Sequence, residues 1–399
     1  MQLGTGARLG RLIIGLGIGQ IVSWGALIYA IAVLGGPMGT EFGVSNTVVF
    51  GAFSGSLVVS GLAGPYVGKM IDRIGARRIL ALGSLLASVS LAALALAPTI
   101  GAFFVAWAFA GIARSMTLYE AAFAALSQHT GKSFRNSVTA ITLLGGLAGT
   151  VFFPLSLFGL AHFGWRYTVA GFAAAELLIC LPLHLWCIPA GIRGRDVRDE
   201  TPKRVVSGNR ANAAGGTFAA LSTSFALYAF ITSAISVHVV NLLHSKGLGV
   251  ASAVFVASLI GPMQLVGRLV ELTFGRRRSA IVVGAATLVL LAFSLVSLSL
   301  MNAQLAIAVL FAATYGCANG IQTIVRGTVP AELFGHEGYG HMMGKLAAPS
   351  FIARALAPIG LTLCASPRLG YDFSLPVLIG VAVLALITYV AAVRRIRRT

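Results

Sequence analysis

The stretch Gly64-Pro-Tyr-Val-Gly-Lys-Met-Ile-Asp-Arg-Ile-Gly-Ala-Arg-Arg78 decides the fold of this chain. It is charged, contains three glycines and separates two long apolar runs. Glycine permits a tight reversal of the chain and a close approach of two helices. The carboxylate of Asp72 can pair with the arginines that follow it or with exposed helix ends. We therefore predict a short turn between two helices at the surface of a membrane.

The composition of the chain excludes an ordinary soluble domain. Of its 399 residues, 57% are hydrophobic, only 10% are charged, and 48 are glycine. These values are typical of a polytopic membrane protein. The net charge of +18 does not indicate nucleic-acid binding, because the basic residues lie in the short gaps between apolar runs. The four cysteines lie inside such runs, which argues against a disulfide framework.

Twelve apolar runs are long enough to span a bilayer, which takes roughly 20 residues. The first run follows Arg8 and Arg11 and is too long for a signal peptide. We predict an all-α polytopic membrane protein with twelve transmembrane helices, near 12–34, 46–67, 79–97, 99–127, 136–161, 166–190, 216–243, 249–274, 279–300, 303–328, 339–366 and 372–393.

The distribution of basic residues predicts how these spans are oriented. The gaps on one side of the membrane and the two termini hold 21 Lys and Arg residues, and the gaps on the other side hold 3. Cytoplasmic loops carry the excess of positive charge. Both termini are therefore expected in the cytoplasm, at the inner (plasma) membrane of a bacterium. The long polar segment 191–215 is predicted to be a cytoplasmic linker between two six-helix bundles, 1–190 and 216–399.

With apolar runs on both sides, the opening stretch resembles the signature loop of the major facilitator superfamily of transporters, G-x-x-x-D-R-x-G-x-R-R. The matching residues are Gly68, Asp72, Arg73, Gly75, Arg77 and Arg78. The resemblance implies two pseudo-symmetric six-helix bundles with a site between them. The equivalent position in the second half has Leu272 and Arg276 in place of the glycine and the acid. We therefore expect the intact copy to act as a cytoplasmic gate rather than as a substrate site.

No pattern in the sequence indicates an enzyme. There is no phosphate-binding G-x-x-x-x-G-K-[ST], no H-E-x-x-H, and no Cys/His cluster with metal-ligand spacing. No cofactor and no metal are expected. The expected partners are a small-molecule substrate, the lipid bilayer and, where transport is coupled, a proton, and the protein is expected to work as a monomer.

Charged residues inside the apolar runs are the candidates for function, because a charge at a helix centre costs about 2.5–3.5 kcal/mol on insertion scales. Arg114 and Arg268 lie inside the fourth and eighth runs. An arginine keeps its proton and must therefore face an anion, a carboxylate or water. Arg326, Lys345, Arg354, Glu176 and Glu271 also lie in or at the ends of spans, and the sequence leaves open whether they are functional or structural.

The eighth run also resembles the corresponding helix of monocarboxylate-transporter-like members of the superfamily. In those members the helix carries an acid four residues before an arginine. The arginine engages the substrate carboxylate and the acid takes part in proton coupling, so the resemblance implies that Arg268 engages a substrate carboxylate. Gln264 stands where the acid would be, so proton coupling through this helix is not expected. Glu120 is then the candidate proton carrier, since a carboxylate in an apolar span can change its protonation state. The first run adds three candidate substrate contacts, Gln20, Trp24 and Tyr29.

These residues favour a secondary active transporter that moves a small organic anion, such as a monocarboxylate, by alternating access. Two alternatives stay open: efflux of a drug-like or metalloid toxicant, and a membrane sensor that transports nothing. Drug antiporters usually carry G-P-x-x-G-G in the fifth helix, whereas this chain has Gly145-Gly-Leu-Ala-Gly149, which counts against that alternative.

Overall fold

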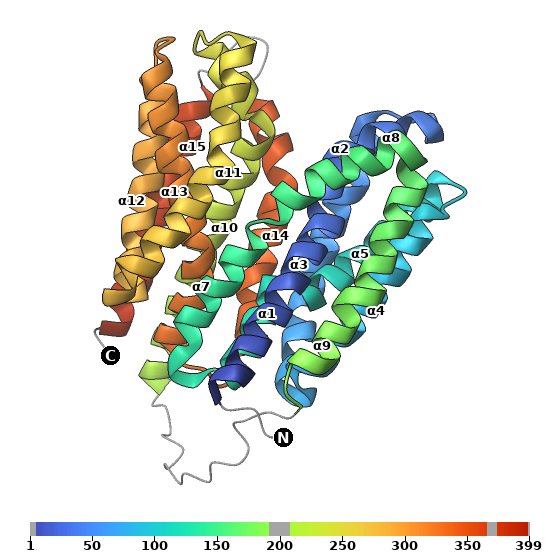
Figure 1. The fold of residues 1–399 in the computed structure, drawn as a ribbon. Helices are drawn as coiled ribbons and strands as arrows, with labels where there is room; N and C mark the ends of the chain where they lie inside the picture. Colours follow the sequence, from blue (N-terminus) through green and yellow to red (C-terminus); the bar gives the residue numbers. More distant parts are fainter. Residues whose placement is uncertain (1–4, 191–207, 365–372, 398–399) are drawn as a thin grey trace. The chain divides into compact units, whose positions relative to one another are not determined.

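The computed structural model describes residues 5–190, 208–364 and 373–397, and the regular elements in these ranges are all helices (Figure 1). The chain divides into two compact units, Met1–Val197 with His336–Ala348, and Arg198–Gly335 with Pro349–Thr399. The second segment of the first unit was not expected from the sequence. It contains the first ten residues of helix α14, Tyr339–Cys364, so this helix runs from one unit into the other.

The first unit otherwise contains the helices of the N-terminal half. They are α1 (Thr5–Trp24), η1 (Gly25–Tyr29), α2 (Ala30–Phe42), α3 (Asn46–Ile74), α4 (Ala76–Ala95), α5 (Ile100–Thr117), α6 (Tyr119–His129), η2 (Gly131–Ser133), α7 (Phe134–Gly145), α8 (Ala148–Ala175), η3 (Glu176–Cys180) and α9 (Leu181–Cys187). Large apolar side chains from α2, α5 and α8, among them Leu34, Phe103 and Phe172, form its core.

The second unit contains the helices of the C-terminal half. They are α10 (Gly208–Ser245), α11 (Val250–Thr273), η4 (Gly275–Arg277), α12 (Ala280–Ser299), α13 (Leu305–Phe334), the later part of α14, and α15 (Ser374–Arg397). Helix α13 packs against both α11 and α12, and α10 packs against α15. Helix α10 begins inside the predicted linker 191–215, of which residues 191–207 lie outside the described ranges.

The described residues contain eleven helical segments that are long and apolar enough to cross a membrane. One of them, Gly131–Cys187, has 57 residues and contains two crossings. At about 1.5 Å per residue it is far longer than the roughly 30 Å hydrocarbon core. Gly164 divides it, with φ 77° and ψ 171° inside α8. The predicted count of twelve spans is therefore confirmed.

The structure corrects the predicted turn at residues 64–78. Helix α3 continues to Ile74 and α4 begins at Ala76, so most of the stretch is helical. The reversal takes place at Gly75, whose φ of 89° favours glycine. Its N–H donates to the Ile71 carbonyl and closes the last turn of α3.

Three predicted runs are helical but irregular. The run 99–127 is broken at Leu118, which has extended backbone angles between α5 and α6. The run 12–34 contains the π-helical turn η1, and the run 166–190 contains the π-helical turn η3. Hydropathy reports the length of a span but not a change in its hydrogen-bond register, so the sequence did not indicate these three features.

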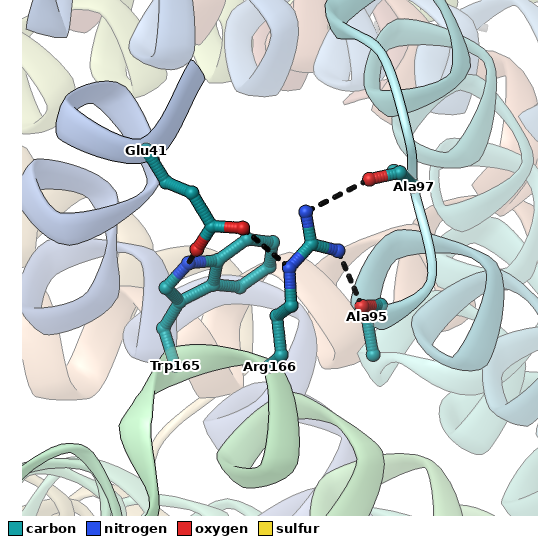
Figure 2. Close-up of polar contacts among 5 residues, drawn as sticks. All are labelled: Glu41, Ala95, Ala97, Trp165 and Arg166. Carbon is teal, nitrogen blue, oxygen red and sulfur yellow. Dashed lines mark hydrogen bonds and ion pairs between the residues drawn. The ribbon is translucent and has the colours of Figure 1, made fainter. Parts of the chain in front are cut away.

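An ion pair joins three helix ends in the first unit (Figure 2). Glu41, near the end of α2, accepts hydrogen bonds from Arg166 Nε at 2.6 Å and from the Trp165 indole. The other two nitrogens of the Arg166 guanidinium donate to the carbonyls of Ala95 and Ala97 at the end of α4, at 2.6 and 2.9 Å. The carbonyls at the end of a helix and just beyond it have no donors within that helix. Arg166 therefore donates hydrogen bonds to carbonyls that α4 itself leaves unsatisfied.

We expect Arg166→Ala to destabilise the protein more than Glu41→Gln does. Both side chains are partly exposed, so the ion pair by itself contributes little. The arginine also holds two carbonyls, and the expected loss of unfolding free energy is about 1 kcal/mol or more. Thermal unfolding of the two variants in the same detergent measures the difference. Equal unfolding temperatures would contradict a role for the carbonyl contacts.

Candidate functional site

The signature stretch holds the start of helix α14. Both oxygens of the Asp72 carboxylate accept backbone hydrogen bonds, from Gly340 N–H at 2.9 Å and from His341 N–H at 2.7 Å. These N–H groups belong to the first turn of α14, where the helix has unsatisfied donors and a partial positive charge. Asp72 therefore binds a helix end. The arginines of the stretch stand apart from this contact, since Arg73 and Arg78 are exposed and Arg77 is half-buried.

Glycines allow α3 and α14 to approach at this place. A Cβ atom added to Gly68 would overlap the carbonyl of Gly340, and one added to Gly344 would overlap the carbonyl of Gly64. All the obstructing atoms are backbone, which cannot rotate out of the way as a side chain can. His341 adds a hydrogen bond between its Nδ1 and the carbonyl of Pro65, at 3.0 Å.

A second histidine fixes the connection that leads into α14. His336 Nδ1 lies 2.8 Å from the Ser127 hydroxyl of α6, and its ring packs edge-on against Phe134 of α7. Burial lowers the pKa of His336 below its ordinary value of 6.5, so the ring is neutral at pH 7. The segment 336–348 is thus attached to the first unit both by backbone contacts and by side chains.

The candidates on the first span lie together at the break between α5 and α6. Gln20 is fully buried and donates from Nε2 to the Thr117 carbonyl at 2.7 Å, while its Oε1 accepts from the Trp24 indole at 3.2 Å. The Trp24 ring lies 6.1 Å from Tyr29 and 5.1 Å from Tyr119, between ring centroids. Gln20, Trp24 and Tyr29 are therefore neighbours, and Tyr119 is a fourth member that the sequence did not single out.

Glu120 lies in the first turn of α6 and is half-buried. Its position follows directly after Tyr119, at the broken part of the fourth span. Its role as a proton carrier stays a prediction.

Arg114 is fully enclosed by the first unit. Its Nη1 donates to the Ser56 hydroxyl at 2.9 Å, its Nη2 donates to the Leu27 carbonyl at 2.8 Å, and its guanidinium lies 5.2 Å from the centre of the Phe53 ring. These contacts join α5 to η1 and α3. The Leu27 carbonyl lies in the π-helical turn, where the backbone register changes. A role for Arg114 in substrate binding also stays a prediction.

In the second unit, Arg268 is buried on α11, and Gln264 lies one turn before it, half-buried. Glycines of the facing helix α13 let the two helices touch. A Cβ on Gly320 would overlap the Gln264 carbonyl, and a Cβ on Gly267 would overlap the carbonyl of Cys317. The turn of α11 that leads to Arg268 is therefore held close to α13 by backbone contacts.

Three arginines of the second unit, from three helices, lie near enough to Tyr228 for their charges to act on it. The buried Tyr228 hydroxyl donates to Asn319 Oδ1 at 2.7 Å, joining α10 to α13. The charges of Arg268, Arg326 and Arg354, from α11, α13 and α14, all act on this hydroxyl. The sequence named the arginines, but it left Arg326 and Arg354 undecided and missed Tyr228. The only feature of the sequence that pointed to this group was the excess of arginines over acidic residues in the C-terminal spans.

The sequence profile of the Major Facilitator Superfamily matches residues 16–358 of the chain, which is more than half of its length. The chain belongs to the Major Facilitator Superfamily. A search of curated protein sequences gave no significant match. Members of this superfamily are transporters and not enzymes, as the sequence indicated.

Solved structures of transporters have the same fold. The human organic anion transporter MFSD10 (TETRAN) is 18% identical, with a TM-score of 0.72 over 97% of this chain and 100% of that one. The proton:xylose symporter XylE is 13% identical, with a TM-score of 0.73 over 96% and 95%. The E. coli fucose:proton symporter FucP is 11% identical, with a TM-score of 0.72 over 95% and 98%. At these identities the similarity establishes the fold alone.

For this superfamily member we expect Asp72→Asn to slow transport with little effect on ligand binding. The amide keeps the shape of the carboxylate but removes its charge and one of its two acceptors at the start of α14. A loss of about 1–2 kcal/mol at this contact corresponds to a roughly tenfold lower turnover. Transport rates and ligand affinity, measured on the same preparation, test this result. The control is Lys69→Gln, an exposed residue on the same helix. A large loss of affinity in Asp72→Asn would contradict the gate assignment.

Proposed function

We propose that the protein is a secondary active transporter of small organic anions, with monocarboxylates as the first class to test. The observation that carries the proposal is that the charges of three arginines, Arg268, Arg326 and Arg354, all act on the Tyr228 hydroxyl. Each of these cations is costly in an apolar helix. An anionic ligand would compensate the positive charge of all three arginines.

The balance of charge supports an anion. Among the described residues of the second unit, the helices carry two carboxylates, Glu271 and Glu332. Glu332 accepts hydrogen bonds from the Ser279 hydroxyl and from Ala280 N–H, at 2.8 Å, at the start of α12. Glu271, which is buried one turn after Arg268, is then the remaining acid. Even a complete pairing with Glu271 leaves the group of three arginines with two positive charges in excess.

The hydrogen-bond donors suit a carboxylate. A guanidinium stays charged in a protein and presents a planar set of donors that matches a carboxylate with two parallel bonds. Because Asn319 Oδ1 accepts from Tyr228, the amide NH₂ of Asn319 remains as a further donor. One of the similar structures is an organic anion transporter, which agrees with this class, but the arginine group carries the argument.

The transport cycle that we propose is alternating access, in a monomer, in a bacterial inner membrane with both termini in the cytoplasm. Support for the orientation comes from the distribution of basic residues, which favours the cytoplasmic side by 21 to 3. The attachment of α14 to Asp72 supports a gate, since α14 continues from the first unit into the second. A gate of this kind would close one side of the membrane while the other is open.

The decisive experiment measures uptake of labelled lactate by the purified protein in proteoliposomes. Unlabelled pyruvate, succinate and citrate are added as competitors, and choline and glycerol as non-anionic controls. We expect uptake that anions inhibit and that choline and glycerol leave unchanged. Succinate competing more strongly than pyruvate would assign dianions instead. No uptake of any anion, together with thermal stabilisation by organic cations or arsenite, would overturn the proposal in favour of efflux.

A further inference from the structure

A row of polar groups runs along the contact between the first span and the sixth. On α1, Gly15, Gly19 and Ser23 follow each other at intervals of four and therefore share one face. Added Cβ atoms would overlap the Cys187 side chain at Gly15 and His184 Nε2 at Gly19, both from α9. Further along, the Ser23 hydroxyl lies beside Glu176 and Cys180 of η3. We refer to this contact, Gly15, Gly19 and Ser23 against Glu176, Cys180, His184 and Cys187, as the α1–α9 seam.

Polar atoms of the seam are buried without hydrogen bonds of good geometry. The Glu176 side chain is fully buried, and neither of its carboxylate oxygens forms a hydrogen bond of good geometry with the described residues. The Ser23 hydroxyl and His184 Nε2 also lack a hydrogen bond of good geometry. The other ring nitrogen, His184 Nδ1, lies 2.8 Å from the Ser84 hydroxyl of α4. Buried polar groups in proteins are nearly always bonded, so three such groups in one seam require an explanation.

Among the described residues, no positive charge acts on the Glu176 carboxyl. The groups that act on its carboxyl are the Ser23 hydroxyl from α1 and the Cys180 thiol from η3 itself. Neither α4 nor α8, which also pack against η3, brings a lysine, arginine or histidine charge to it. His184 on α9 faces Gly19 and Ser84. An ionised carboxylate in such a place would be extremely costly, and a neutral carboxylic acid would not.

The backbone is irregular on both sides of this contact. Glu176 begins the π-helical turn η3, in which the Leu181 N–H bonds to the Glu176 carbonyl five residues earlier. The other π-helical turn, η1, begins two residues after Ser23. Single π-helical turns inside α-helices are frequent at functional sites and interrupt the regular register. Two helices that meet at a buried acid each change register beside it, which gives the seam a place to open.

From this arrangement we propose that Glu176 is a proton-binding site of the transporter. With the seam closed, as in this structure, Glu176 is the carboxylic acid. When α1 and η3 separate, water reaches the side chain, which releases its proton to water as hydronium and becomes a carboxylate. The reverse step takes a proton from hydronium as the seam closes. This site goes beyond the proposed anion transport and does not depend on it, and it is separate from Glu120.

Infrared spectroscopy tests the site without any substrate. A protonated carboxyl group in an apolar place has a C=O stretching band that a carboxylate lacks, and the band shifts in heavy water. We compare the purified wild type with Glu176→Gln and Glu120→Gln at neutral pH. We expect the band in the wild type and in Glu120→Gln and its loss in Glu176→Gln. Ser23→Ala should shift the band without removing it.

The opposite pattern would overturn the proposal, namely a band that persists in Glu176→Gln. If Glu176→Gln fails to fold, the test uses Ser23→Ala instead. A band that is not shifted in Ser23→Ala would contradict the assignment to Glu176. A second measurement uses proteoliposomes with labelled lactate. Glu176→Gln should lose uptake driven by a pH gradient and keep lactate exchange at equal pH. A wild type that carries no lactate, but shows the band at Glu176, would refute the monocarboxylate proposal and leave the proton site standing.

Discussion

We expect that replacing Arg268 with glutamine will lower the affinity of the transporter for its proposed organic-anion substrates by about ten- to a hundredfold. A hydrogen bond to a charged partner contributes about 1.5–3 kcal/mol, and each 1.4 kcal/mol is a factor of ten in affinity. Glutamine keeps a polar side chain on α11 but removes the charge and the second parallel donor.

Binding of lactate and succinate to the purified variants, followed by calorimetry or thermal shift, measures this effect. The matched control is Arg277→Gln, the same substitution at an exposed position in η4, just beyond the end of α11. The control should bind as the wild type does. Unchanged affinity and unchanged turnover in Arg268→Gln would rule out this arginine as the counter-charge of the substrate.

Gly68→Ala is expected to stop transport and to lower the thermal stability of the protein. The added methyl group would overlap the Gly340 carbonyl, and the atoms around it are backbone atoms of α14. The two helices must move apart, which would also pull Gly340 and His341 away from Asp72. Overpacking of this kind typically costs about 1–3 kcal/mol, and the loss of the Asp72 contacts adds to it.

Gly51→Ala is the matched control, because it lies on the same helix and has open space around its Cβ position. Alanine favours helix over glycine, so this variant should be as stable as the wild type or slightly more stable. Unfolding temperature and lactate uptake are compared for both variants. If Gly68→Ala behaves like Gly51→Ala, the close contact between α3 and α14 is not needed for function.

The sequence by itself determined the class of the protein and the number of its spans. Apolar runs of about 20 residues and basic gaps are local properties of the chain, since a bilayer tests each span for length and polarity separately. The signature stretch was also visible, because its glycines, acid and arginines are close in sequence. Its conformation was only partly predictable, because residues 64–74 of the stretch continue helix α3 and the reversal takes place at Gly75 alone.

Only the tertiary structure decided what the polar residues touch. Asp72 binds the start of α14, 268 residues further along the chain, because the unsatisfied N–H groups of a helix end donate hydrogen bonds to any carboxylate that the fold brings to them. Arg268, Arg326, Arg354 and Tyr228 come from four helices, and hydropathy does not specify which faces of four helices meet. In sequence, Glu176 is one acid in an apolar run. In the structure it lies beside Ser23, and no cation in the described part of the chain acts on it, which makes it the candidate proton site. Helix packing sets these environments, and packing depends on contacts between residues far apart in the chain.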